Sequence, residues 1–113
     1  MNNKNLLDLF SGCGGFSCGF HKLGFNVMCA NELEKEISET YAFNFPETNI
    51  VVGDITTKKT KNEIYSIFND KKCNIIVGGP PCVAYSLSGL RDPRDKRGQL
   101  FKDYIEIVKN LKP

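Results

Sequence analysis

Short, mainly apolar runs alternate with amphipathic stretches along the whole chain, and this alternation limits the fold more than any other feature. The apolar runs cover residues 5–10, 26–30, 49–52 and 74–77. The stretches between and after them favour helices over residues 16–23, 34–45, 59–69 and 100–111. Alternating strands and helices join through right-handed crossovers into a parallel sheet that is covered on both faces. We therefore predict an α/β, Rossmann-like fold with about four parallel strands and flanking helices.

Helical spacing and loop composition refine this pattern. Ile37, Tyr41 and Phe45 recur every four residues, which places them on one face of the second predicted helix. Residues 83–98 carry turn formers and mixed charges, so we expect a long loop there.

Size and composition fit a single small domain. The chain has 113 residues, with 41% hydrophobic and 25% charged residues, as in ordinary globular proteins. Its net charge of +2 is too small to argue for nucleic-acid binding by itself. Residues 1–5 do not resemble a secretory signal, and no run approaches the roughly 20 apolar residues of a membrane span, so we expect no membrane association.

The cysteines predict a reducing compartment. The chain has five, an odd number, and no two are spaced as C-x-x-C. A disulfide framework and a zinc site are therefore both disfavoured, and we expect a cytoplasmic protein without a metal. Cys29 and Cys73 lie in or beside apolar runs and Cys18 in the first helix, so we expect these three to be buried and inert.

A glycine-rich turn, residues 12–15, follows the first apolar run and precedes a helix. Glycines allow a ligand to approach the backbone closely, and the helix start supplies free amides. Glu32 ends the second run, where a carboxylate can accept hydrogen bonds from ribose hydroxyls. Asp54 ends the third run and could accept a hydrogen bond from an adenine amino group. These features predict a nucleoside cofactor, with a simple tight turn as the alternative. Ser17 stands where dinucleotide-binding turns have their third glycine, which makes nicotinamide or flavin cofactors the weaker choice.

The fourth apolar run ends in Gly-Gly-Pro-Pro-Cys, residues 78–82. Two prolines stiffen this loop and place the Cys82 thiol at the mouth of the sheet, beside the predicted cofactor. A thiolate in such a position is a nucleophile, whereas the alternative is a buried, inert cysteine.

Together these segments resemble the signatures of cytosine-C5 DNA methyltransferases, in order and over nearly the whole chain. The segments concerned are residues 8–20, Asn31 with Glu32, residues 53–55, residues 78–82 followed by Ala84, Tyr85, Ser86 and Gly89, and residues 97–101. The resemblance implies an S-adenosylmethionine-dependent methyltransferase fold. Residues 1–113 would form the N-terminal part of the catalytic domain, without a target-recognition domain.

The resemblance also implies a role for individual residues. Cys82 would be the catalytic nucleophile. The residues implied to bind S-adenosyl-L-methionine are Phe10, Gly12, Cys13, Gly14, Gly15, Asn31, Glu32, Leu33, Asp54, Ile55, Gly79, Pro81 and Leu100. Those implied to contact double-stranded DNA are Ser86, Arg91, Arg94 and Arg97. Because acidic residues are interleaved with these arginines, a solvated loop with self-cancelling charges is the alternative. Val83 departs from the family, which usually has glutamine after the cysteine.

The family chemistry needs more than these segments. A thiolate adds to C6 of a flipped cytosine, so that C5 can take a methyl group from the sulfonium. The acid that assists at N3 belongs to a Glu-Asn-Val signature, which would follow residue 113 together with the DNA reader. Glu106 is no obvious substitute, and we expect it on a solvated helix face, as we do His21.

We therefore expect this chain to be inactive alone. Either a second polypeptide supplies the C-terminal part, or the chain is a truncated remnant, and in both cases residues 74–77 form an open sheet edge. The whole enzyme would serve a restriction-modification system. The alternatives are a non-catalytic S-adenosylmethionine-binding remnant, an RNA cytosine-C5 methyltransferase and an unrelated nucleotide-dependent oxidoreductase.

Overall fold

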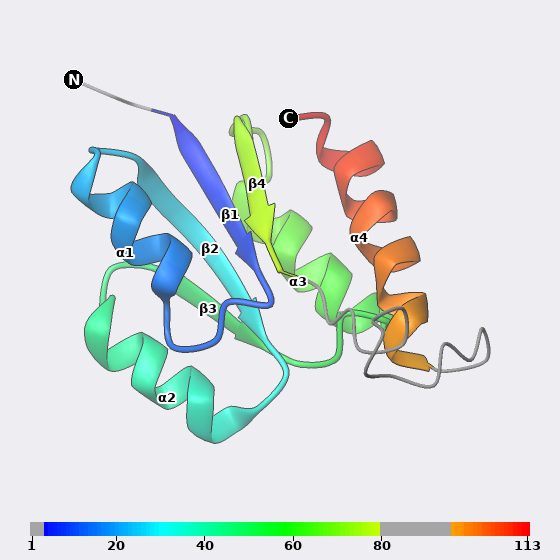
Figure 1. Cartoon of the computed structure of the whole chain (residues 1–113). Coiled ribbons are helices and arrows are strands. Elements are labelled where there is room, and N and C mark those ends of the chain that lie inside the picture. The colour runs from blue at the N-terminus through cyan, green and yellow to red at the C-terminus, as the bar shows by residue number, and fades with distance from the viewer. Residues whose placement is uncertain (1–3, 80–95) are drawn as a thin grey trace.

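The computed structural model describes residues 4–79 and 96–113. Within these residues, strands and helices alternate along the chain (Figure 1). In order they are β1 (Asn5–Leu9), α1 (Gly15–Lys22), β2 (Asn26–Glu32), α2 (Lys35–Asn44), β3 (Asn49–Val52), α3 (Lys58–Phe68), β4 (Ile75–Gly78) and α4 (Lys96–Leu111). The α/β alternation predicted from the sequence is confirmed.

The described strands form one sheet in the order β3-β2-β1-β4, and every pair is parallel. Helices α1 and α2 lie against one face, and α3 and α4 lie against the other (Figure 1). Because all strands run the same way, the segments that follow β1, β2, β3 and β4 meet at one end of the sheet. In the described part of the chain β4 pairs with β1 alone and is only half-buried, so the predicted open edge is present.

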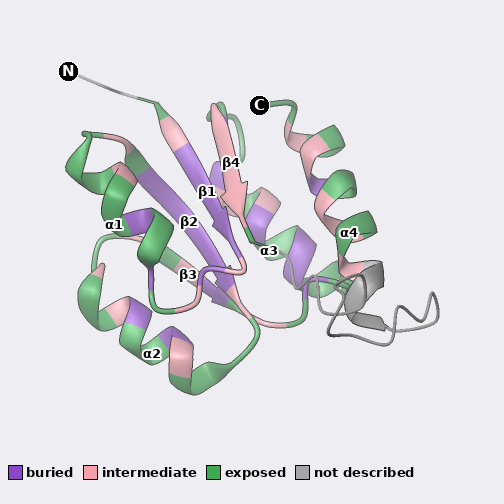
Figure 2. Cartoon of the chain, viewed as in Figure 1, coloured by how far each residue is buried: buried purple, intermediate pink, exposed green. Residues whose placement is uncertain are grey.

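The core lies on both faces of β1, the most buried strand (Figure 2). Leu7 and Leu9 pack in a cluster with Ile64 and Phe68 of α3 and Ile107 of α4. Side chains buried against such a cluster each stabilise the fold by about 1.5–3 kcal/mol. Helix α3 is defined at its start by Thr57, whose side chain accepts a hydrogen bond from the Thr60 amide. Among the described residues no helix is long and apolar enough to span a membrane.

The predicted loop over residues 83–98 is wrong at its C-terminal end, because α4 already begins at Lys96. Lysine, arginine and glutamine favour helices, and here they outweigh the single glycine at position 98. Residues 83–95 of the predicted loop lie outside the described residues.

Helix α4 is attached to α3 by charged side chains. The largely buried Lys61 ammonium donates to Asp103 Oδ1 at 2.8 Å and also pairs with Glu106. Burial lowers the pKa of Lys61, but the hydrogen bonds to Asp103 and Glu106 outweigh that effect, and the net pKa is raised. Glu106 is exposed, as expected for a solvated helix face, and it also pairs with Lys61 of α3. The attachment fixes the helix that carries Leu100.

Candidate functional site

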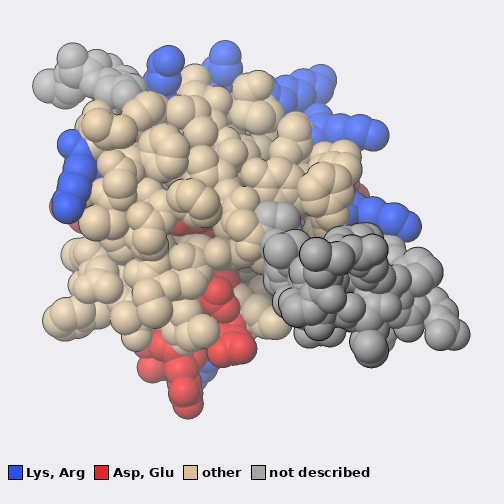
Figure 3. Space-filling view, in the orientation of Figure 1, with Lys and Arg blue, Asp and Glu red and all other residues tan. Residues whose placement is uncertain are grey.

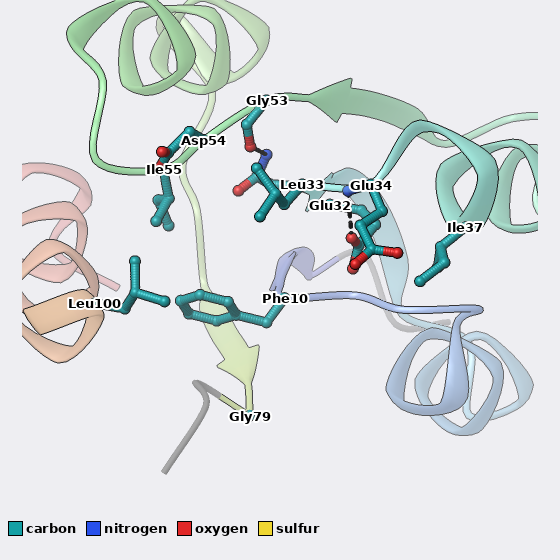
Figure 4. A pocket seen from close by; sticks show the side chains of 11 residues that line it. Phe10, Glu32, Leu33, Glu34, Ile37, Gly53, Asp54, Ile55, Gly79 and Leu100 are labelled. Carbon is teal, nitrogen blue, oxygen red and sulfur yellow. Dashed lines mark hydrogen bonds between the residues drawn. The ribbon is translucent and has the colours of Figure 1, made fainter. Parts of the chain in front are cut away.

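A cavity of about 330 Å³ lies where the four strands end (Figure 4). Its walls come from residues at or just after the ends of β1, β2, β3 and β4, with one contribution each from α2 and α4. The lining residues are Phe10, Asn31, Glu32, Leu33, Glu34, Ile37, Gly53, Asp54, Ile55, Gly79 and Leu100. This volume lies in the range of small-molecule sites, and its position is that of ligand sites in parallel α/β sheets.

The Glu32 carboxylate is held by backbone amides on both sides. Its Oε1 accepts from the Gly12 amide at 3.1 Å, and its Oε2 accepts from the Glu34 amide at 2.7 Å. The first bond ties the glycine-rich turn to the end of β2. A carboxylate has about four acceptor positions, so roughly two of them stay open to a ligand.

Asn31 bonds through its side chain to the end of β3, beside the cavity. Its buried side-chain amide donates to the Val51 carbonyl at 2.8 Å and to the Gly53 carbonyl at 3.2 Å. Both N–H groups of the amide are thereby occupied. Asn31 borders the cavity, but its side chain fixes the end of β3 and has no hydrogen left to donate to a ligand.

Asp54 stands at the start of the turn into α3. Its Oδ1 accepts from the Thr56 amide at 2.9 Å and from the Thr56 hydroxyl at 2.8 Å. The amide bond and then the hydroxyl bond hold the pKa of Asp54 below its usual value, so the carboxylate stays ionised. Among the described residues no group bonds to Oδ2, which leaves this oxygen for a donor in the cavity.

Apolar side chains form the remaining walls. Phe10 has a φ of 53°, a left-handed conformation that is unfavourable for a bulky residue and therefore suggests a functional position. Its ring stacks on that of Tyr104 with centroids 6.5 Å apart. Across the cavity, Leu33 is 63% exposed although it is large and apolar, while Ile55 is buried. A flat, partly apolar ligand could cover these surfaces.

The charge in the cavity is of one sign. Glu32, Glu34 and Asp54 line it, and no Lys, Arg or His does so among the described residues. In Figure 3 the acidic side chains gather in the lower part, toward which the strands run in Figure 1, while Lys and Arg occupy the upper and outer margins. Such a site favours a neutral or cationic ligand and disfavours phosphate groups.

The glycine-rich turn borders the site without lining it. Gly12 reaches the cavity wall through its bond to Glu32, and α1 begins at Gly15. Gly14 has a φ of 106° and packs so closely against Phe45 that a Cβ would lie 2.3 Å from the ring. Cys13 is exposed. Gly12, Cys13, Gly14 and Gly15 do not line the cavity themselves.

Three lining residues were not predicted: Glu34, Ile37 and Gly53. Gly53 belongs to residues 53–55, one of the segments that resemble the family signatures, so this resemblance could have indicated it. Ile37 had been placed on a helix face by its spacing, which does not distinguish a wall of a cavity from the core.

The predicted sites after the fourth strand are only partly described. Gly79 and Leu100 line the cavity. Arg97 falls in the first turn of α4. The remaining ones lie outside the described residues, namely Pro81, Cys82, Ser86, Arg91 and Arg94.

The other cysteines separate into two groups. Cys29 and Cys73 are buried as predicted, and burial raises the pKa of their thiols to about 12 and about 11. The prediction for Cys18 is wrong, because this side chain is exposed. Ser17 takes the buried position of α1 instead. His21 is exposed as expected.

A parallel α/β sheet with a glycine-rich turn, and with acidic side chains at the ends of β2 and β3, defines a protein of the Rossmann-like α/β class. The chain belongs to the family of C-5 cytosine-specific DNA methylases, whose family profile matches residues 4–113. It is 43% identical over 109 residues to the type II methyltransferase M.DdeI of Desulfomicrobium norvegicum, covering 96% of this chain and 26% of that protein. It is 44% identical over 113 residues to M.NgoPII of Neisseria gonorrhoeae, covering 99% of this chain and 31% of that protein.

Solved structures agree with this assignment. A putative DNA modification methyltransferase encoded in an E. coli prophage superposes with a TM-score of 0.80 at 35% identity, over 98% of this chain and 30% of that one. The DNMT2 of Spodoptera frugiperda gives 0.67 at 28% identity, over 94% of this chain and 31% of that one. The methyltransferase fold predicted from the sequence is thus confirmed. The chain spans only a quarter to a third of these proteins.

Proposed function

We propose that this chain is the cofactor-binding and nucleophile-bearing part of a cytosine-C5 DNA methyltransferase of a restriction-modification system. The reaction would transfer a methyl group from S-adenosyl-L-methionine to C5 of cytosine in double-stranded DNA. The observation that carries the proposal is the acidic cavity, in which residues from all four strand ends come together. The family assignment supplies the reaction.

The cavity suits S-adenosylmethionine chemically. The open acceptor positions of Glu32 would receive the ribose hydroxyls, and Asp54 Oδ2 would receive the adenine amino group. Leu33 and Ile55 would cover the purine, and Phe10 would contact the remainder of the cofactor. When bound, the cofactor supplies an electrophilic methyl group on a sulfonium. A cation fits a site lined by carboxylates without Lys or Arg among its described residues, whereas the phosphates of a dinucleotide do not.

Cys82 would perform the covalent step. Its thiolate adds to C6 of a cytosine that has left the helix, which makes C5 nucleophilic. After C5 has taken the methyl group, C5 loses its proton and the thiolate leaves. Arg91, Arg94 and Arg97 would hold the DNA backbone through its phosphates. We place the protein in the cytoplasm, where thiols stay reduced.

Turnover would need the remainder of the enzyme. M.DdeI and M.NgoPII are three to four times as long as this chain, and the half-buried β4 has an unpaired edge among the described strands. We propose that a further segment, from a second polypeptide or from a longer chain, pairs with β4. A non-catalytic cofactor-binding remnant is the alternative that this arrangement also allows.

Calorimetry with S-adenosylhomocysteine tests the cofactor site. We expect the folded chain to bind S-adenosylhomocysteine and Glu32→Ala to lose much of the affinity. Glu39→Ala is the control and should leave the affinity unchanged, because Glu39 is an exposed carboxylate of α2 that does not line the cavity. Binding of a dinucleotide phosphate in place of S-adenosylhomocysteine would overturn the cofactor assignment.

A trapping assay tests the chemistry. Combined with a C-terminal region such as the longer relatives have, and with S-adenosylmethionine present, the chain should form a covalent adduct with DNA carrying 5-fluorocytosine, and Cys82→Ser should abolish it. RNA with the same base analogue serves as the second arm. Adducts on RNA alone would assign the protein to RNA methylation, and adducts that persist in the Cys82→Ser variant would exclude Cys82 as the nucleophile.

A further inference from the structure

A buried chain of hydrogen bonds joins three elements beneath the glycine-rich turn. Asp8 of β1, Ser17 of α1 and Tyr41 of α2 are all fully buried. The Ser17 hydroxyl donates to Asp8 Oδ2 at 2.7 Å and lies 2.7 Å from the Tyr41 hydroxyl. In the hydrogen bond between Ser17 and Tyr41 either hydroxyl can be the donor. Ser17 is therefore the link between the sheet and α2.

Ser17 occupies a position that requires a small residue. In dinucleotide-binding turns the third glycine stands here, since a helix that follows the turn must approach the first strand closely. Serine is small enough for the same approach, and its hydroxyl bonds to the strand itself. Without it, Asp8 would lose its side-chain hydrogen bond, and Asp8 Oδ1 already has no partner among the described residues.

Helix α2 holds the turn at a second point. Phe45 lies one helical turn after Tyr41, with ring centroids 4.8 Å apart, and its ring packs against Gly14. Gly14 and Ser17 are themselves one turn apart at the start of α1. The Tyr41–Phe45 pair thus contacts the first turn of α1 at two places, beside the loop whose Gly12 amide holds Glu32.

We propose that Ser17 is a positioning residue for the cofactor. By joining Asp8 to Tyr41 it fixes the start of α1, and with it the Gly12 amide that orients the Glu32 carboxylate toward the ligand. Ser17 does not line the cavity and acts only through these neighbours. This role rests on the proposed function as far as the ligand is concerned, but the link from Ser17 to Gly12 can be measured without any ligand.

Ser17→Ala in the full chain removes the hydroxyl and almost no volume. We expect faster hydrogen exchange of the Gly12 amide relative to that of Leu9, followed by NMR, and about tenfold weaker binding of S-adenosylhomocysteine. Ile64→Val is the matched control, because it trims a fully buried side chain that lies outside the cavity. It should lower stability by about 0.5–1.5 kcal/mol and leave both readouts unchanged.

Two results would overturn the proposal. One is a Ser17→Ala variant that loses stability as Ile64→Val does, while Gly12 exchange and affinity stay as in the unaltered chain. The other is an equal change of both readouts in Ile64→Val. If the unaltered chain binds no S-adenosylhomocysteine, the proposed function fails, and Gly12 exchange still decides the role of Ser17. If Ser17→Ala does not fold, Tyr41→Phe takes its place, because this variant keeps the Ser17–Asp8 bond. It should show the same two changes at smaller size. If both readouts stay unchanged in Tyr41→Phe, the proposal is overturned.

Discussion

Of two adjacent glycines at the end of β4, only one should lose stability when it is replaced by alanine. Gly78 pairs with Leu9 of β1, and a Cβ on it would lie 2.5 Å from the Leu9 carbonyl oxygen. A Cβ on Gly79 would meet only the edge of the Phe16 ring, at 4.0 Å. Neither glycine has a left-handed φ. Gly78→Ala is therefore limited by space, and Gly79→Ala is not.

The expected cost follows from what must move. The atom opposite Gly78 belongs to the backbone of the central strand, so it cannot rotate away as a side chain could. Overpacking of this kind costs about 1–3 kcal/mol, and the lower entropy of the unfolded alanine variant offsets about 0.4–1 kcal/mol of it. We expect a net loss of about 1–2 kcal/mol for Gly78→Ala, or a fall in Tm on the order of 5–15 °C. Gly79→Ala should keep its stability.

Urea unfolding followed by far-UV circular dichroism measures both variants. Their m-values should match that of the unaltered chain, so that a shift in midpoint reports stability alone. Gly79 lines the cavity, and its variant should show its effect in S-adenosylhomocysteine affinity instead. The reasoning is refuted if Gly78→Ala unfolds within about 0.5 kcal/mol of the unaltered chain, or if Gly79→Ala is the less stable of the two.

Four further substitutions address other contacts. Asn31→Asp removes both donors to the end of β3 and buries a charge there, so it should cost about 2–5 kcal/mol in urea unfolding, whereas a loss under about 1 kcal/mol would contradict the role of the amide. Lys61→Met should lower stability by about 1–2 kcal/mol, mainly through the largely buried Asp103, and Glu106→Gln should change it far less. Burial raises the pKa of Asp8, so the contribution of this group to folding stability should be complete below about pH 4 and be lost as the pH rises through the folded-state value. The Asp8→Asn variant should lack this decline, and a stability that rises with pH equally in both proteins would contradict it.

The sheet and the place of the site could be predicted because they depend on patterns along the chain. Apolar runs that end in glycine or an acidic residue fix both the parallel strands and the edge at which their ends meet. Glu32 and Asp54 were found in this way, since the carboxyl ends of parallel strands share one side of the sheet. The cavity follows from topology alone.

Contacts between elements could not be predicted in the same way. The pairing of Lys61 with Glu106 joins residues 45 positions apart, and no periodicity marks it. Cys18 was assigned to the core because cysteine is usually buried, but α1 buries the polar Ser17 instead. A polar residue can take a core position only when its partners are present, and here they come from two other elements.

The carboxylates of this protein show what the backbone contributes to the site. Glu32 and Asp54 can face one cavity because amides of Gly12, Glu34 and Thr56 already bond to them. These donors are set by turns, so each carboxylate is oriented before a ligand arrives, and binding need not order the side chain. Asp8 has no such amide donor on Oδ1, and burial raises its pKa where hydrogen bonds lower that of Asp54. Burial thus raises the pKa of the Asp8 carboxyl group within the sheet, whereas backbone and hydroxyl donors lower that of Asp54 at its mouth.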